Sequence, residues 1–182
     1  MSRLPIPASI DAAPASSQPL LKAVQQQLGS VPNLFRLVSL STVALEGYLS
    51  LSSALGKGSL PAATRERIAV AVAQVNRCGY CLSAHTYLGK TLAKLSEEEI
   101  QANRHGRSLD AQANAAVQFA VRVTLARGQI SDADLAAVRE AGFGDAQIIE
   151  IVQHVALNTW TNYINEVAKT DIDFPKVDVE LA

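Results

Sequence analysis

Apolar residues recur every three or four positions along most of this chain, which is the period of an amphipathic helix. From Leu20 onward the pattern is broken only by short stretches rich in helix-starting and helix-ending residues. We therefore predict helices over residues 20–28, 34–40, 42–55, 61–77, 79–95, 110–127 and 145–169, with shorter ones after Ser96 and Ser131. No segment alternates over a useful length as a strand would. The predicted fold class is all-α.

The predicted helix ends coincide with residues that suit them. Gly29 and Gly128 stand where a helix should stop, and Pro61 stands in a first turn, where its missing N–H costs nothing. Ser96 precedes three glutamates, which is a typical N-cap with acidic residues in the first turn. These signals make the helical interpretation consistent at both ends of the elements.

The first residues of the chain differ from the rest. Residues 1–19 are rich in Pro, Ala and Ser and show no period, so we expect an extended N-terminal arm, either disordered or laid across a neighbouring subunit. Residues 20–182 then form a single helical domain. A chain of 182 residues with 48% apolar content is long enough to bury one substantial core.

Charge and hydropathy exclude several classes of protein. The net charge of -1 gives no reason to expect a nucleic acid or an anionic membrane as partner. No apolar run could span a bilayer, and no secretory signal is visible at the start. We expect a cytoplasmic protein, and in that reducing compartment a C-x-x-C pair is more often catalytic or metal-binding than structural.

The chemistry of the chain concentrates in one motif. Cys78 and Cys81 are the only cysteines, and His85 follows Cys81 by one helical turn. Together with Leu88 and Leu92 they step by three and four, so all five share one helix face. His85 is within direct or one-water reach of Cys81, but it lies roughly 10 Å along the axis from Cys78. The imidazole is therefore placed to act as a base for Cys81.

The start of the helix provides a second influence on the thiols. Unpaired N–H groups and the positive end of the helix dipole stabilise a thiolate, so both cysteines are candidates for activation. In a C-x-x-C at a helix start the first cysteine usually attacks. The position of His85 favours Cys81 instead, because proton transfer requires contact.

Glu66 precedes Cys78 by twelve residues, on the preceding predicted helix. The break near Arg77 lets the two helices fold back as a hairpin, and counting from it brings Glu66 level with His85. We therefore predict the order Glu66, His85, Cys81, in which a carboxylate orients an imidazole that activates a thiol. Because Glu66 shares its face with small apolar residues, we expect it to be buried.

Other interpretations of these residues remain open. Cys78, Cys81, His85 and Glu66 could bind zinc, although most structural zinc sites use two separated pairs of ligands. A structural disulfide would close a very small loop and stabilise little. Haem attachment is excluded because Leu82, not histidine, follows the second cysteine.

The remaining polar candidates have simpler explanations. Glu66 could be an ordinary surface charge, since arginines flank it. His105 lies in a polar stretch and is expected to be solvated. His154 lies in the last helix near Trp160, where packing is favoured over chemistry.

The pattern E-x11-C-x2-C-x3-H formed by Glu66, Cys78, Cys81 and His85 resembles the AhpD-like alkylhydroperoxidases of the carboxymuconolactone decarboxylase superfamily. Residues 29–35, 161–165 and 173–175 also resemble its peroxidase-related branch, so the resemblance covers nearly the whole chain. Characterised members can carry a second histidine between the cysteines, where this chain has Tyr80.

The resemblance implies an all-α AhpD-like helical bundle that assembles into homo-trimers or homo-hexamers and needs no cofactor or metal. It implies that Cys81 is the peroxidatic cysteine, that Cys78 resolves its sulfenic acid, and that Glu66 and His85 relay protons with bound water. The implied reductant is a dithiol such as a protein-bound lipoyl group.

We therefore predict a thiol-dependent peroxidase for small organic peroxides or hydrogen peroxide. A thiol-disulfide exchanger or redox sensor with slow peroxide turnover is the first alternative. A zinc-stabilised helical scaffold is the second.

Overall fold

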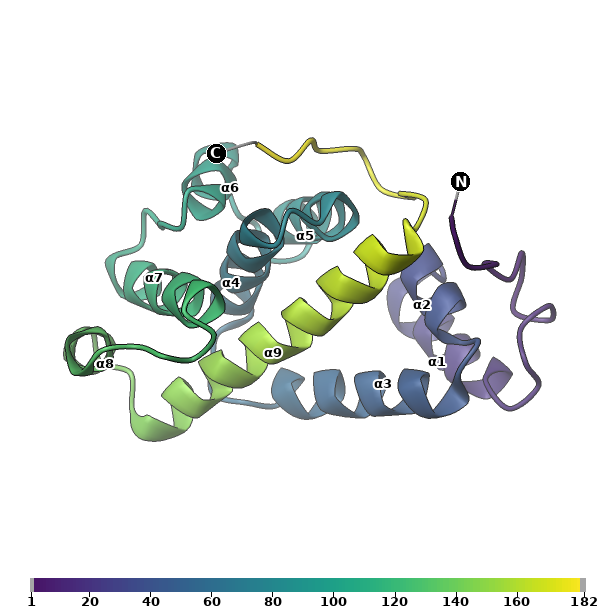
Figure 1. Cartoon of the computed structure of the whole chain (residues 1–182), viewed down its shortest axis with the longest axis horizontal. Helices are drawn as coiled ribbons and strands as arrows, with labels where there is room; N and C mark the ends of the chain where they lie inside the picture. The colour runs from purple at the N-terminus through teal and green to yellow at the C-terminus, as the bar shows by residue number, and fades with distance from the viewer. Residues whose placement is uncertain (1, 181–182) are drawn as a thin grey trace.

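A computed structural model of the chain describes residues 2–180, and these residues form nine helices and no strand (Figure 1). The all-α prediction is confirmed. The helices are α1 (Gln18–Leu28), α2 (Asn33–Val38), α3 (Thr42–Gly56), α4 (Ala62–Val75), α5 (Gly79–Thr91), α6 (Glu97–Arg104), α7 (Ala111–Leu125), α8 (Asp132–Glu140) and α9 (Asp145–Ala168).

Most helix ends fall where the sequence placed them. Gly29 adopts a left-handed φ of 78° and ends α1, and Ser96 accepts a hydrogen bond from the Glu99 N–H at the start of α6. The main difference is α5, which we predicted to reach Leu95. It ends at Thr91, because the chain turns through Lys94 at a φ of 57° and the Leu95 N–H bonds back to the Gly89 carbonyl.

Helix α4 is the central element of the bundle and packs against α5, α6, α7 and α9. Its residues from Ile68 to Ala73 are all buried. Val70 and Ala73 face an apolar cluster that contains both cysteines, while Ile68 and Val72 face a second cluster built with α7, α8 and α9. The cysteine motif therefore lies directly against the core of the fold.

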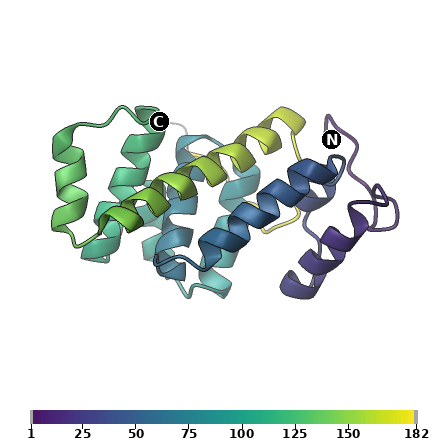
Figure 2. The ribbon, with the colours of Figure 1, turned by 90° about the horizontal axis from the view of Figure 1, so that it is seen from below.

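Helix α9 crosses the molecule diagonally and lies beside α3 in both views (Figures 1 and 2). It also packs against α4 and α5. This long helix brings residues from the end of the chain to the thiols and to the first helices, and it places its polar residues at the site described below.

The N-terminal arm is anchored on its own chain. The Arg3 N–H donates to the Ala168 carbonyl at 2.6 Å, and the Ser17 hydroxyl donates to the Ser39 carbonyl at 2.7 Å. The guanidinium of Arg36 donates to the Ala8 carbonyl at 2.9 Å. These contacts hold residues of the arm against α2, α9 and the residue that follows α2. The expected crossing to a neighbouring subunit stays a prediction.

The C-terminal segment after α9 runs extended across α5 and α6 (Figure 1). The Val177 N–H donates to the Ser83 hydroxyl on α5 at 3.0 Å, and Arg104 on α6 pairs with Glu180 at 2.9 Å. Ile172 and Phe174 pack on the apolar cluster that holds the cysteines. The segment thus covers one side of the cysteine motif.

No helix in the described part of the chain is long and apolar enough to cross a membrane.

Candidate active site

Cys78 occupies the N-cap of α5, where its Sγ accepts a hydrogen bond from the Cys81 N–H at 3.3 Å. A thiol takes the place that serine or aspartate usually fills at a helix start. Arg77, at a φ of 56°, makes the sharp turn between α4 and α5. Both cysteines are buried and unbridged. The turn and the cap together bring the two sulfurs to the same helix end.

Glu66 and His85 form the hydrogen bond that the hairpin argument predicted. Their Oε2 and Nδ1 atoms are 2.9 Å apart, with the ring N–H donating to the carboxylate. The predicted register of α4 against α5 is therefore confirmed. The expected burial of Glu66 is wrong, since its side chain is 25% exposed and that of His85 is 23% exposed. Both line a cavity instead of the core.

Two asparagines of α9 lie beside the Cys81 sulfur. The Asn165 amide donates to Sγ at 3.2 Å, and Asn162 lies close enough to affect the same thiol. Asn162 is held by Asn76, whose amide donates to its side-chain oxygen at 2.8 Å. Sequence reasoning gave neither residue a role. The available signal was the spacing of two asparagines three positions apart, which puts both on one face of the last helix.

The surroundings make Cys81 the more acidic thiol. Burial raises its pKa, but the hydrogen bond from Cys78, the charge of His85 and the two amides outweigh burial and lower the pKa to about 7. The same hydrogen bond to Cys81, together with burial, raises the pKa of Cys78. The expectation that the helix start activates both thiols is wrong for Cys78, because its proton stabilises the neighbouring thiolate. Because the pKa of Cys81 is lowered and that of Cys78 is raised, Cys81 is the better candidate for the nucleophile.

The surroundings of His85 favour its protonated form. Burial lowers its pKa, but the carboxylate of Glu66 outweighs burial and raises it, with a further rise from Cys81. The imidazolium form is therefore stabilised when His85 takes a proton. Glu66 and His85 are joined by a hydrogen bond, and His85 and Cys81 act on each other through their charges. The catalytic roles of the four motif residues stay predictions.

A cavity of about 610 Å³ opens in front of this pair. Its wall is mixed: besides Glu66, His85 and Asn158 it carries further polar side chains, which are Gln27, Ser52, Ser53, Lys57, Arg65, His154 and Thr161. The apolar part is formed by Leu28, Tyr48, Leu49, Leu92, Ala93 and Leu157. Neither cysteine lines the wall, and both thiols are buried. The cavity can hold an organic molecule with a polar group directed at the imidazole.

His154 also lines this cavity, although the sequence placed it in packing. It is buried, and its Nε2 atom has no hydrogen-bond partner. Burial and the nearby Arg65 lower its pKa to about 4, against smaller opposing effects of Glu150 and Glu66. His154 is thus a neutral imidazole in the cavity wall. His105, by contrast, is exposed as predicted, with Nε2 3.8 Å from Glu180.

The hydroxyl of Tyr80 bonds to the start of α2 and to the C-terminal segment, not to the thiols. It accepts a hydrogen bond from the Leu34 N–H at 3.0 Å and donates to Asp173 at 2.9 Å. The same aspartate accepts from the Asn33 N–H at 2.7 Å. Tyr80 therefore ties α5 to the start of α2 and to the C-terminal segment, and it does not replace a second imidazole at the cysteines.

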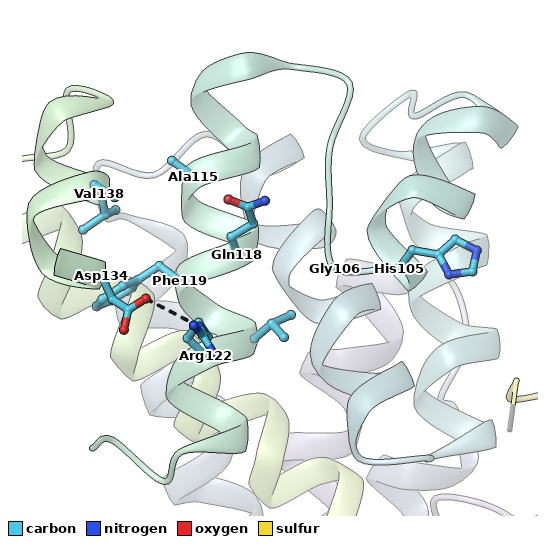
Figure 3. A pocket seen from close by; sticks show the side chains of 10 residues that line it. His105, Gly106, Ala115, Gln118, Phe119, Arg122, Asp134 and Val138 are labelled. Atoms are coloured by element: carbon cyan, nitrogen blue, oxygen red, sulfur yellow. Dashed lines mark ion pairs between the residues drawn. The ribbon is translucent and has the colours of Figure 1, made fainter. Parts of the chain in front are cut away.

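A second cavity, of about 420 Å³, lies between the end of α6, α7 and α8 (Figure 3). Arg122 and Asp134 form an ion pair of 3.5 Å on its wall, while the ring of His105 points away from them. Its polar groups do not converge on one point. Among residues 2–180 no group of three or more His, Cys, Asp or Glu side chains is arranged to hold a metal ion.

The fold and the site define a class of protein: an all-helical thiol protein with a C-x-x-C pair at a helix start and a histidine–glutamate pair beside it. Residues 43–126, which include the whole motif, match the Carboxymuconolactone decarboxylase family. Over these residues the chain is similar to that family, and its fold is similar to that of an AhpD core. No curated protein matches the chain.

Solved structures are similar to the chain over more than nine tenths of its length. A peroxidase-related protein with an alkylhydroperoxidase AhpD core from Ralstonia eutropha JMP134 is 27% identical, with a TM-score of 0.83 over 94% of this chain and 92% of that chain. A peroxidase-related protein from Silicibacter sp. TM1040 is also 27% identical, with a TM-score of 0.81 over 93% and 91%. The debrominase Bmp8, solved with 2,3,4-tribromopyrrole, shares the fold at 17% identity, with a TM-score of 0.78 over 92% and 90%.

Proposed function

We propose that this protein is a thiol-dependent peroxidase that reduces organic hydroperoxides or hydrogen peroxide through a dithiol–disulfide cycle of Cys78 and Cys81. The observation that carries the proposal is the Glu66–His85 hydrogen bond on the wall of a cavity, beside a thiol whose pKa is about 7. A nucleophile, a base and an orienting carboxylate are the parts that activated-thiol chemistry requires.

The cycle follows from these positions. His85 takes the Cys81 proton, directly or through water, and Glu66 stabilises the imidazolium. The Cys81 thiolate attacks one peroxide oxygen, the O–O bond breaks, and the other oxygen leaves as an alcohol or as water after it gains a proton. Cys81 is now a sulfenic acid.

Cys78 then closes the cycle. Its sulfur attacks the Cys81 sulfur, the sulfenic oxygen leaves as water, and a disulfide forms. The short link between the two residues, with the Cys78 Sγ 3.3 Å from the Cys81 N–H, supports this step. A dithiol reductant such as a lipoyl group restores both thiols by exchange.

The cavity favours organic substrates over hydrogen peroxide. A volume of about 610 Å³ is within the usual range for small-molecule sites and far exceeds a molecule of two heavy atoms. The leucines of the wall would bind an apolar tail, and the side chains of Glu66 and His85 would receive the hydroperoxide group.

A second candidate is thiol-dependent reduction of another organic electrophile. The same cavity is large enough for it, and the debrominase Bmp8 has this fold. A thiol-disulfide exchanger or sensor would use the same cysteines with slow peroxide turnover. The zinc scaffold lacks support, since the described side chains form no such metal group.

Steady-state turnover decides among these functions. We expect sustained reduction of an alkyl hydroperoxide with dihydrolipoamide as reductant, and none with Cys81→Ser. Cys78→Ser should still form a sulfenic acid that a dimedone-type reagent traps, without turnover. If Cys78→Ser resists labelling and Cys81→Ser is labelled, the two roles are reversed. Turnover of a halogenated aromatic but not of peroxide would favour the second candidate.

We also propose that the protein assembles as a homo-oligomer, either a trimer or a hexamer. Helix α9 exposes Ile149, Tyr163 and Val167 at 68%, 60% and 62%, and α3 exposes Val43 at 78%. An apolar hollow of about 350 Å³ lies between these two helices. An apolar surface shared by two adjacent helices is typical of a subunit contact.

A further inference from the structure

Tyr48 on α3 is held in a fixed position at the cavity. Its ring stacks on Trp160 of α9, with centroids 5.4 Å apart and planes at 24°, and it packs at 54° against Phe35 of α2. The side chain lines the cavity that also contains Glu66 and His85. Two aromatic neighbours therefore present this phenol to whatever binds in front of the motif.

The hydroxyl of Tyr48 is free for a ligand. It forms no hydrogen bond with any residue from 2 to 180, whereas the hydroxyl of Tyr80 is fully used by Leu34 and Asp173. It is also absent from the set of polar atoms that are sealed in the interior without a partner. A phenol held rigidly by its ring, with an accessible and unused O–H, is arranged as a hydrogen-bond donor to a substrate.

Tyr48 shares the cavity wall with Glu66 and His85, and the charge of Cys81 also acts on its hydroxyl. Burial raises the pKa of Tyr48, and the negative charges of Cys81 and Glu66 raise it further. The phenol therefore keeps its proton at neutral pH and stands within electrostatic reach of the thiolate. It is a donor, not a base.

We propose that Tyr48 is a further catalytic residue that donates its proton to the oxygen leaving the peroxide when Cys81 attacks. This inference rests on the peroxidase function proposed above. Tyr48 would make the hydrogen bond on the side of the peroxide that faces away from the attacking sulfur, because the leaving oxygen departs opposite the nucleophile.

The step balances in atoms and charge. The Cys81 thiolate forms an S–O bond, the O–O bond breaks, and its electron pair stays on the leaving oxygen. That oxygen takes the proton of Tyr48 and departs as an alcohol or as water. The tyrosinate then recovers a proton from the imidazolium of His85, which holds the proton that Cys81 lost. Cys81 is oxidised by two electrons and the peroxide is reduced by two.

The chemistry requires a donor of this kind. Hydroxide, the simplest leaving group, is the conjugate base of water, whose pKa is about 15.7 in bulk. A phenol is a stronger acid than that, even when burial raises its pKa above the usual value of about 10. His85 is bonded through Nδ1 to Glu66 and serves Cys81, so a separate donor on another helix can meet the leaving oxygen.

The test compares two reactions of the same thiol in Tyr48→Phe. The variant keeps the ring and removes only an oxygen that bonds nothing in the chain, so its fold should be unchanged. With an alkyl hydroperoxide we expect the rate constant of Cys81 oxidation to fall about 10²-fold. With iodoacetamide, whose iodide leaves without a proton, we expect an unchanged rate and pH profile. Tyr163→Phe, an exposed tyrosine of α9, is the control and should match the wild type in both reactions.

A peracid supplies the second readout, because a carboxylate leaving group needs little proton donation. The loss in the rate constant of Cys81 oxidation caused by Tyr48→Phe should be smaller with the peracid than with the alkyl hydroperoxide. Equal rates of hydroperoxide reduction in the variant and the wild type would overturn the role of Tyr48 alone, and so would a matching loss in alkylation. A wild-type thiol that does not react with peroxide would overturn the proposed function and this inference together.

Discussion

The Asn165 side-chain amide lies 3.2 Å from the Cys81 sulfur, although 84 positions of sequence separate the two residues. The N–H donates toward the sulfur and so stabilises the thiolate relative to the thiol. The last helix of the fold thereby helps Cys78 and His85 to lower the pKa of a cysteine that belongs to the motif on α5.

Replacing this amide should make Cys81 less acidic. Hydrogen bonds to charged groups contribute roughly 1.5–3 kcal/mol, and one pKa unit corresponds to about 1.4 kcal/mol. We therefore expect Asn165→Ala to move the midpoint of Cys81 alkylation upward by about one to two pH units. Asn158→Ala is the matched control, since Asn158 lies on the same helix and bonds the His154 carbonyl instead of the sulfur. Coincident midpoints for Asn165→Ala and the wild type would contradict this account of the low pKa.

The sequence alone was sufficient to predict the contact of the site that lies within one helical hairpin. The Glu66–His85 contact follows from helical spacing and the turn at Arg77, because both are local in the chain. The roles of Asn162 and Asn165 could not be inferred in this way, since they depend on how α9 crosses α4 and α5. Helical periodicity specifies which face is apolar but not which neighbour it meets.

Two expectations, the burial of Glu66 and the acidity of Cys78, were wrong for the same physical reason. Glu66 was expected to be buried because its own face is apolar, but a cavity formed with α3 and α9 opens in front of it. Cys78 was expected to be acidic at a helix start, yet its contact with Cys81 reverses that effect. Both errors concern interactions between side chains that the sequence pattern does not specify.

The proton relay predicts a difference between two substitutions. His85→Gln removes the base and the positive charge beside Cys81, so the alkylation midpoint should rise and the peroxide reaction should slow by about 10²- to 10⁴-fold. Glu66→Gln keeps the imidazole and removes only the carboxylate that stabilises its protonated form, so its effect should be smaller. Stopped-flow oxidation and the pH profile of alkylation measure both. An unchanged profile in His85→Gln would refute the relay.

The lowered pKa of His154 predicts how the free energy of unfolding depends on pH. Its pKa of about 4 in the folded protein lies below the ordinary value of 6.5, so the unfolded chain binds the proton more readily. The folded state therefore loses stability as pH falls through this window, by roughly 3 kcal/mol between pH 7.5 and pH 4 from this group. Urea unfolding at the two pH values should show a smaller loss in His154→Leu. The exposed His105→Gln should behave as the wild type, and an equal loss in all three proteins would contradict the prediction.

The exposed apolar residues of α3 and α9 predict assembly. Light scattering at micromolar concentration should give a multiple of the 19.3 kDa chain mass. Ile149→Glu should weaken the assembly, because it places a charge on the apolar surface of α9. A mass near 19.3 kDa for the wild type would rule out the oligomer. A chain without residues 1–18 tests the arm, and an undiminished oligomer would exclude only the arm from the contact.

The central claim is that Cys78 and Cys81 cycle between two thiols and a disulfide, and that peroxide is reduced when the disulfide forms. The most direct measurement is a count of free thiols, with a metal assay on the same sample, before and after one equivalent of an alkyl hydroperoxide. The account predicts two thiols lost per chain without bound zinc, a Cys78–Cys81 disulfide in the peptide map, and recovery of both thiols with dihydrolipoamide. Two thiols that persist after peroxide, or one zinc ion per chain, would contradict it.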